Sequence, residues 1–340
     1  MTDRQWKGER VTIKDIARAA NVDPSTVTRA LQGSERVRQS TRERIAALAE
    51  EMGYVPNQAA RTLVTSKSQL IGLVIPDLTN PFFAALDRGI EEEAGKHGFK
   101  VMIRNTNGDT EAEREAIRFF TAMKVDGIVA AMARCSTNFY GALQAAVPIV
   151  HVNRDDLPHH VCCDREAGTY GIIEHLIELG HRRIAYVTGP GPASSPKYNG
   201  FKRALAAHGL SYEPERTLRF NGELQDCEHI AAQLLAIKPR PTAIFAWNDQ
   251  CAIGLHHALR ERGVRVPEDL SIAGHDDIAI APFVEPALTT VHWPMYELGQ
   301  ASIRYLYRLR DGQRVRRPRI PAPTVKIRAS TAPPQKNRGG

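Results

Sequence analysis

Residues 12–31 read TIKDIARAANVDPSTVTRAL, and this stretch predicts two short helices joined by a tight turn. Thr12 and Asp15 stand three residues apart, a spacing at which both side chains satisfy backbone N–H groups at the start of a helix. After the turn, Asp23 followed by Pro24 is typical of a second helix start. The stretch therefore predicts a helix-turn-helix unit.

The second predicted helix has a free face of short polar side chains. Val27 and Leu31, four residues apart, are expected to pack against the first helix. The residues left outside are Ser25, Thr26, Thr28 and Arg29. Such a face can approach a DNA groove closely, and Arg29 could donate two hydrogen bonds to a guanine edge, worth about 1–3 kcal/mol. The alternative for Arg29 is an ordinary solvated side chain.

A third helix is predicted from a capping box at 40–43 to Gly53, the usual C-terminal cap. Pro56 then breaks the chain. The next segment, 57–63, is long enough for only a two-turn helix, which is unstable alone in water. Contacts outside the segment must therefore order it.

The body of the chain alternates short apolar runs with helical stretches. Strands are expected near 70–75, 100–105, 127–131, 149–152, 183–188, 243–246 and 271–275. This alternation predicts an α/β fold with parallel sheets covered by helices on both faces. Ligands of such folds bind outside the carboxyl ends of the strands.

Composition limits the class of protein. A chain of 340 residues with 42% hydrophobic content can form two or three domains with real cores. Its longest apolar runs are of strand length, far below the roughly 20 residues of a membrane span. The polar N-terminus does not resemble a secretory signal, so we expect a cytoplasmic protein. The five cysteines lack metal-ligand spacing and are expected to be reduced thiols, with no metal site.

Charge is distributed unevenly along the chain. Residues 1–66 hold 11 Lys/Arg and 8 Asp/Glu, residues 67–303 hold 23 and 29, and residues 304–340 hold 11 and 1. A basic head on an acidic body suits a phosphate-binding module joined to a sensor of neutral ligands. The basic stretch at the C-terminal end, from Arg304 to Arg319, could touch nucleic acid or be a solvated face, and the sequence assigns it no function.

Several motifs together resemble the LacI/GalR family of bacterial repressors. In the head they are TIKDIA at 12–17, PSTVTRAL at 24–31, GYVPN at 53–57 and ARTL at 60–63. In the body they are IGLVIPD at 71–77, NPFF at 80–83, GHRRIA at 180–185, ND at 248–249, GHDD at 274–277 and STAPP at 330–334. The resemblance covers nearly the whole chain.

The resemblance implies a domain organisation. It is a helix-turn-helix domain at 1–56, a hinge helix and linker at 57–66, an effector-binding and dimerisation domain at 67–332, and a disordered tail at 333–340. Within the effector-binding domain, one lobe would comprise about 70–163 plus 293–322, and the other 164–291 plus 323–330. Both lobes would be doubly wound and parallel, as in type I periplasmic binding proteins.

The resemblance also assigns site residues. Candidate DNA contacts are Thr12, Pro24, Ser25, Thr26, Thr28, Arg29, Asn57, Arg61 and Leu63. Leu63 matches the family leucine that wedges into a base step from the minor groove, and simple packing between paired hinge helices is its alternative. Phe82, Phe83, Asn153, Asn248 and Asp276 match family effector contacts. The other candidate effector contacts are Asp77 and Asn80, which follow a predicted strand, and Lys197, Glu223 and Trp293. Each polar one could instead be a helix cap or a loop-fixing residue.

Acceptors and amides beside flat aromatic faces suit a hydroxyl-rich ring, so a sugar is the expected effector. Lys197 stands where relatives commonly carry Arg, and it keeps a point charge without the planar fork. His275 stands where Phe or Tyr is frequent, and the alignment at Glu223 is loose. A sugar acid or sugar phosphate therefore remains an alternative.

The sequence thus predicts a homodimeric transcriptional regulator, most simply a repressor, that binds a roughly palindromic DNA operator under the control of a small effector. Catalytic motifs such as Gly-x-Ser-x-Gly or a Walker loop are absent from the sequence, so neither an enzyme nor a cofactor is expected. The alternatives are a solute-binding protein of the same core fold and a transcriptional activator. Whether the effector releases the protein from DNA or loads it stays open.

Overall fold

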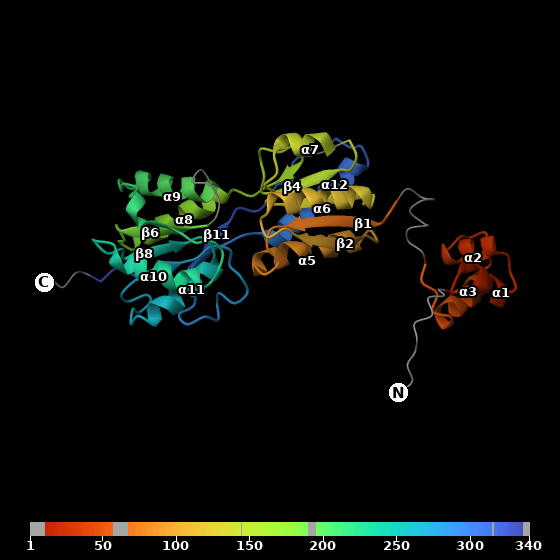
Figure 1. Ribbon diagram of the computed structural model, residues 1–340, viewed down its shortest axis with the longest axis horizontal. Helices are drawn as coiled ribbons and strands as arrows, with labels where there is room; N and C mark the ends of the chain where they lie inside the picture. The colour runs from red at the N-terminus through yellow and green to blue at the C-terminus, as the bar shows by residue number, and fades with distance from the viewer. Residues whose placement is uncertain (1–10, 57–66, 144, 190–194, 315, 336–340) are drawn as a thin grey trace, which may run out of the picture. The chain divides into compact units, whose positions relative to one another are not determined.

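The chain forms two compact units, Met1–Ser68 and Gln69–Gly340. The computed structural model describes residues 11–56, 67–143, 145–189, 195–314 and 316–335 (Figure 1). The predicted hinge segment 57–63 lies outside the described residues, and so do Asn57, Arg61 and Leu63.

The first unit is a three-helix head with a hydrophobic core of its own. Its helices are α1 (Ile13–Ala20), α2 (Pro24–Leu31) and α3 (Gln39–Glu51). Each helix contributes a fully buried branched side chain to the core, namely Ile16, Val27 and Ile45. These contacts fix the angle between α1 and α2, as the helix-turn-helix prediction requires.

Local hydrogen bonds explain where the first two helices begin. The Thr12 backbone N–H and hydroxyl both donate to the Asp15 carboxylate, at 2.9 and 2.7 Å. Asp23 accepts from the backbone N–H of Ser25 at 2.7 Å, and Pro24 occupies the first turn of α2. Both predicted helix starts are confirmed.

The predicted start of the third helix is wrong. α3 begins at Gln39, one residue before Ser40, and its N-cap Arg38 makes no capping hydrogen bond through its side chain. Ser40 falls inside the first turn, which is held by a hydrogen bond from the Gln39 amide to Glu43 at 2.6 Å. The predicted end at Gly53 is confirmed, because Gly53 adopts the left-handed conformation with φ of 65°.

The second unit contains two α/β lobes. The N-terminal lobe has a five-stranded parallel sheet in the order β2-β1-β3-β4-β5. Its strands are β1 (Leu70–Ile75), β2 (Lys100–Asn105), β3 (Gly127–Ala131), β4 (Ile149–Val152) and β5 (His160–Val161). Its helices are α5 (Pro81–Gly95), α6 (Thr110–Ala122), α7 (Thr137–Leu143) and α12 (Met295–Arg310). The side chains of α5 and α12 pack on one face of the sheet, and those of α6 and α7 pack on the other.

The C-terminal lobe has a four-stranded parallel sheet in the order β7-β6-β8-β9. Its strands are β6 (Ile184–Thr188), β7 (Thr217–Arg219), β8 (Ala243–Ala246) and β9 (Ser271–Ala273). Its helices are α8 (Arg165–Glu178), α9 (Pro196–Ala207), α10 (Asp226–Ala236) and α11 (Asp249–Arg260), with a 3₁₀ turn at Pro214–Arg216. Helices α8 and α9 cover one face, and α10 and α11 cover the other (Figure 1).

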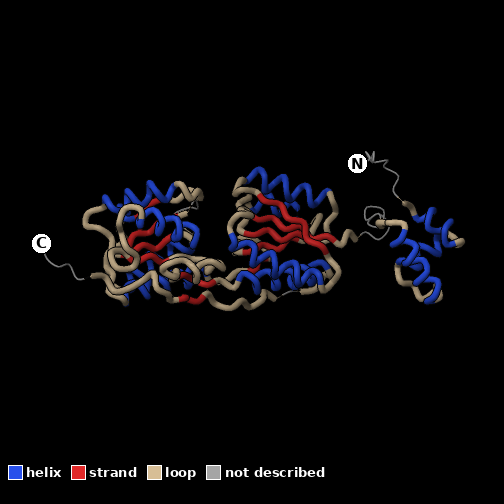
Figure 2. The backbone as a smooth tube through the Cα atoms, turned by 90° about the horizontal axis from the view of Figure 1, so that it is seen from below, coloured by secondary structure: helices blue, strands red, loops and turns tan. Residues whose placement is uncertain are grey.

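The chain passes between the lobes more than once (Figure 2). It crosses first between β5 and α8, returns after β10 (Thr290–His292) to form α12, and crosses again to β11 (Thr324–Lys326). β10 and β11 pair as an antiparallel two-stranded sheet. The N-terminal lobe is therefore completed by a helix from near the end of the chain.

The predicted fold class is confirmed, and five strands have their predicted bounds: β1, β2, β3, β4 and β8. The strand expected at 271–275 ends at Ala273, because the chain turns at Gly274 and Asp276 reaches a φ of 128°. The sequence did not predict β5, β7, β10 or β11. These strands are two or three residues long, too short for an alternating pattern to be recognised.

Candidate functional site

The exposed face of α2 carries the predicted DNA contacts that the structure describes. Pro24, Ser25 and Arg29 are exposed, and Thr26 and Thr28 are partly buried. The Thr28 hydroxyl donates to the Pro24 carbonyl at 3.0 Å, which leaves its lone pairs available as acceptors. The Arg29 carbonyl accepts from the Ser34 N–H at 3.0 Å, but its guanidinium has no hydrogen-bond or ion-pair partner among the described residues.

The other predicted DNA contact in the head, Thr12, is exposed at the start of α1. Because its hydroxyl hydrogen already goes to Asp15, it can offer an external partner only an acceptor. The face formed by α2 and the start of α1 therefore combines short acceptors with one unpaired guanidinium.

The second group of predicted contacts follows the carboxyl ends of strands in both lobes. Asn80 caps α5 after β1, Asn153 follows β4, Asn248 caps α11 after β8, and Asp276 follows β9. All four side chains are buried. The structure joins the two lobes at this edge, because the Gln250 side chain of α11 donates to the carbonyl of Thr79, the residue before Asn80, at 3.4 Å.

Lys197 and Asp276 form the charged centre of this group. The Lys197 Nζ lies 3.9 Å from an Asp276 carboxylate oxygen, and both residues are more than nine-tenths buried. Lys197 also donates to the Trp247 carbonyl at 2.8 Å and stands 4.2 Å from the centre of the Trp247 ring. Burial raises the pKa of the Asp276 carboxyl and lowers the pKa of the Lys197 ammonium, and each charge opposes the shift of the other.

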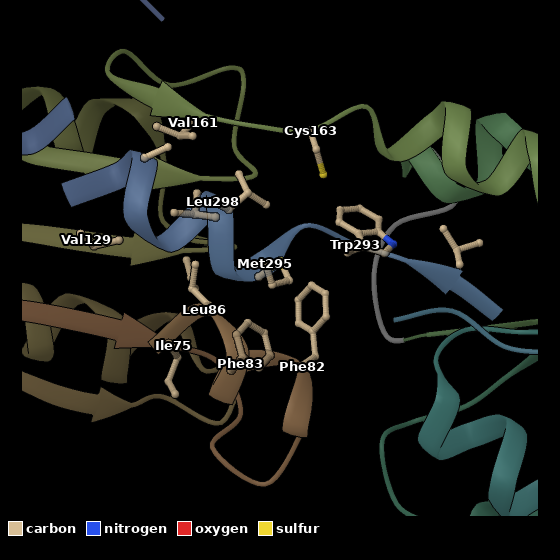
Figure 3. Close-up of a cluster of buried hydrophobic side chains, with 14 of the residues drawn as sticks. Ile75, Phe82, Phe83, Leu86, Val129, Val161, Cys163, Trp293, Met295 and Leu298 are labelled. Atoms are coloured by element: carbon tan, nitrogen blue, oxygen red, sulfur yellow. The ribbon is translucent and has the colours of Figure 1, made fainter. Parts of the chain in front are cut away.

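Aromatic side chains from both lobes lie beside the charged pair. Phe82 of α5 meets the Trp293 ring edge to face, with centroids 5.9 Å apart, and also contacts Phe83 at 5.1 Å (Figure 3). The Trp293 indole N–H donates to the His275 ring. Burial lowers the pKa of His275 well below its usual value, so this imidazole is neutral and can accept. We call the set Asn80, Phe82, Asn153, Lys197, Asn248, His275, Asp276 and Trp293 the interlobe cluster.

Two polar groups of the interlobe cluster retain unused hydrogen-bonding capacity. Asn153 has a left-handed backbone with φ of 60°, and its Oδ1 accepts from the Cys163 N–H at 3.4 Å. Its buried Nδ2 has no partner within the described part of the chain. The Lys197 ammonium has one close acceptor for three N–H groups. A hydroxyl-bearing ligand would satisfy these donors.

The structure does not bring every predicted contact into the interlobe cluster. Asp77 accepts from the Thr79 N–H and hydroxyl at 2.8 and 2.6 Å, so its carboxylate holds a local turn. Glu223 is exposed in the turn before α10 and shares no described hydrogen bond or ion pair with the cluster. Phe83 is buried in the core between α5 and the sheet.

Sequence reasoning missed two residues near the cluster. Trp247 places its ring against Lys197, although the sequence suggested only that it ends a strand. Arg165, at the start of α8, is close enough to lower the pKa of both Lys197 and His275 by charge repulsion. The sequence offered one signal for Arg165, namely its position just after the chain crosses from β5 to the C-terminal lobe.

Asp249 is buried but serves the fold. Its carboxylate accepts from the Thr290 hydroxyl at 2.5 Å and from the Ile278 N–H at 2.9 Å. Burial raises its pKa to about 6. These bonds tie the start of α11 to β10 and so position the neighbouring Asn248.

The described residues contain no group of three or more His, Cys, Asp or Glu side chains that could hold a metal ion. They also contain no helix that is long and apolar enough to cross a membrane.

Two family descriptions match this chain. Residues 12–57 match "Bacterial regulatory proteins, lacI family", and residues 173–331 match "Periplasmic binding protein-like domain". The first match spans the three-helix head, and the second spans most of the C-terminal lobe together with α12.

Individual relatives match over nearly the full length. The HTH-type transcriptional regulator DegA of Bacillus subtilis is 34% identical, with 95% of this chain and 99% of DegA covered. The lac repressor dimer bound to operator and the anti-inducer ONPF has a TM-score of 0.83 at 28% identity, over 95% of this chain and 100% of that one. A LacI family regulator from Enterococcus faecium with bound ribose has a TM-score of 0.69 at 32% identity, over 78% and 99%.

Proposed function

This chain belongs to the LacI family of bacterial regulatory proteins, and on that premise we propose that it represses transcription by binding a palindromic operator under the control of a sugar held at the interlobe cluster. It is a DNA-binding transcriptional regulator and not an enzyme, as its relatives are regulators. We place it in the cytoplasm, where its DNA is.

The observation that carries the effector proposal is the buried pair Lys197 and Asp276 beside aromatic rings. A sugar hydroxyl both donates and accepts, so it can bridge an ammonium and a carboxylate 3.9 Å apart. Trp293 and Phe82 supply flat apolar surface for the C–H face of the ring. Because Asp276 already compensates the Lys197 charge, an uncharged sugar fits better than a sugar acid or phosphate.

The cluster joins the two lobes, and this suggests how the effector controls DNA binding. The Gln250 side chain of the C-terminal lobe donates to the Thr79 carbonyl of the N-terminal lobe at 3.4 Å, and Phe82 of the N-terminal lobe contacts the Trp293 ring. A ligand that replaces these contacts changes the angle between the lobes. In a dimer, that angle sets the distance between the starts of the two β1 strands, one from each subunit. A coupling free energy of about 1–3 kcal/mol changes operator affinity by about 5- to 150-fold.

A thermal-shift screen tests the effector proposal. A ligand that binds only the folded chain stabilises it by about 2.7 kcal/mol at a concentration 100 times its dissociation constant. We expect a neutral sugar to raise the melting temperature, while the matching sugar acid and sugar phosphate have smaller effects. A larger shift with an anionic sugar would replace the neutral-sugar proposal, and no shift with any of the three classes would contradict a sugar effector.

Arg29→Ala is expected to weaken binding to the selected operator by about 5- to 150-fold, because it removes a bidentate contact worth about 1–3 kcal/mol. Arg29→Lys should recover part of the affinity through charge but little of the base preference, since it lacks the planar fork. Fluorescence anisotropy with the operator and with a random duplex measures the affinity and the base preference of each variant. Equal losses on the two duplexes would show that Arg29 contacts only phosphate.

The dimer interface is proposed to include the apolar patch of Ile280 and Phe283. Their side chains are 51% and 80% exposed, and one turn holds them together through the Phe283 N–H and the Ile280 carbonyl at 2.9 Å. Phe283→Glu should shift the protein toward monomer in sedimentation and weaken operator binding, because a palindrome needs two heads. Ile327→Glu, at an isolated residue that is 64% exposed, is the matched control. An unchanged dimer in Phe283→Glu would place the interface elsewhere.

A further inference from the structure

The end of α12 and the segment after it form a strongly basic surface. Five exposed arginines there have no ion-pair partner among the described residues: Arg308, Arg314, Arg316, Arg317 and Arg319. Two other arginines of this region are paired, Arg304 with Glu93 at 3.2 Å and Arg310 with Asp311 at 3.0 Å. The acidic groups present are thus already neutralised, and a positive surplus remains.

The surface begins at the end of the five-stranded sheet where its parallel strands start, which we call the amino edge. The Arg310 guanidinium stands 5.2 Å from the ring of Phe99, the residue before β2. Leu309 and Arg310 also line a cavity of about 270 Å³ with Pro148, the residue before β4. Lys100 and Lys124, both exposed, lie at the starts of β2 and β3. They extend the positive surface along the same edge.

The chain enters the second unit at this same edge. The Gln69 N–H donates to the Asp126 carboxylate at 2.7 Å, and the Gln69 carbonyl accepts from the Lys100 N–H at 3.0 Å. The twelve residues 57–68 separate this edge from the head, so they can span at most about 40 Å. The length of this segment therefore allows duplex DNA held by the head to reach the amino edge.

Charge complementarity identifies the partner. Duplex DNA carries about one negative charge per 1.7 Å of axis, and arginine binds phosphate oxygens through its planar fork. Residues 67–303, which include Lys100 and Lys124, hold 23 basic and 29 acidic residues, so the arginines that follow them supply a positive charge that the rest of the body lacks.

We propose that this surface, defined by Arg308, Arg314, Arg316, Arg317 and Arg319 with Lys100 and Lys124, binds the phosphate backbone of the DNA that flanks the operator. The contact adds affinity that is independent of base sequence and sensitive to salt. This proposal rests on the proposed function, because it requires that the head bind an operator.

The test compares two duplexes with the full-length protein. One is a selected operator of about 20 base pairs, roughly two helical turns. The other carries the same operator with about 20 further base pairs, again roughly two turns, on each side. Arg308→Gln/Arg314→Gln removes two charges from the surface. Lys202→Gln/Lys238→Gln removes two exposed charges from the C-terminal lobe and is the matched control.

On the long duplex, the wild-type protein should bind more tightly than on the short one and with a steeper salt dependence. Arg308→Gln/Arg314→Gln should lose this advantage and reduce the slope of log K against log salt by up to about 4, since the dimer loses four phosphate contacts and each contributes about 0.9. The control variant should behave as wild type. The short duplex should not distinguish the three proteins.

Three results would overturn the proposal. They are equal affinity of the wild-type protein for both duplexes, an unchanged salt slope in Arg308→Gln/Arg314→Gln, and equal effects of the two double variants, which would indicate net charge alone. If the wild-type protein bound neither duplex, the proposed function itself would fail. Specific binding to the short duplex separates that failure from a failure of this inference.

Discussion

Asp276→Asn protein is expected to bind its operator with wild-type affinity and to show no change at a sugar concentration that is just sufficient for the wild-type response. The substitution keeps the shape of the side chain and tolerates the unusual backbone at this position, where φ is 128°. It removes the buried negative charge 3.9 Å from Lys197. A hydrogen bond to a charged group contributes about 1.5–3 kcal/mol, so sugar affinity should fall by about 10- to 150-fold.

Calorimetric titration with the sugar and anisotropy with the operator measure the two functions separately. Asp269→Asn also removes one negative charge, but from an exposed ion pair with Arg265, and should leave both functions unchanged. An Asp276→Asn protein that still responds to the sugar would place the effector outside the interlobe cluster. A variant that lost operator binding would show that Asp276 acts on the head instead.

Ile45→Ala is expected to unfold the head while the body stays folded. Ile45 is fully buried where α3 meets α1 and α2, and truncating such a side chain costs about 2–5 kcal/mol. A core as small as that of the head rarely supplies more than about 3–5 kcal/mol. Operator affinity should therefore fall by about two orders of magnitude or more, because a loss of about 3 kcal/mol in head stability corresponds to a factor of that size.

Differential scanning calorimetry should show the head transition shifted down or lost, because the head is a compact unit with its own core. The transition of the body and its sugar affinity should not move. Val55→Ala also shortens an apolar side chain, but one that is 79% exposed, and it should leave the head intact. Unchanged operator binding in Ile45→Ala would mean that this core is not needed to hold the DNA-binding surface.

Much of the fold could be predicted because its signals are local. Asp23 and Pro24 mark the start of α2 by their own chemistry, and the apolar run at 70–75 is long enough to indicate a buried strand. The sites at strand ends were predictable for a topological reason, since carboxyl ends of parallel strands share an edge. Asn153 and Asn248 were proposed as contacts in this way, and both follow the end of a strand.

What could not be predicted depends on contacts between distant parts of the chain. The ring of Trp247 lies against Lys197 only because β8 and α9 meet in space. The start of α3 was misplaced because the Gln39 and Glu43 side chains compete with the Ser40 cap. The short strands β10 and β11 exist only through their pairing with each other.

The late position of α12 in the chain affects how the protein is made. The head can fold as soon as its first three helices leave the ribosome, because its core is complete by Glu51. The five-stranded sheet must wait for Met295–Arg310, which follow every strand except β11, before the face that α5 covers in part is completely buried. During synthesis, the rest of that apolar face is exposed to aggregation and is a binding surface for a chaperone.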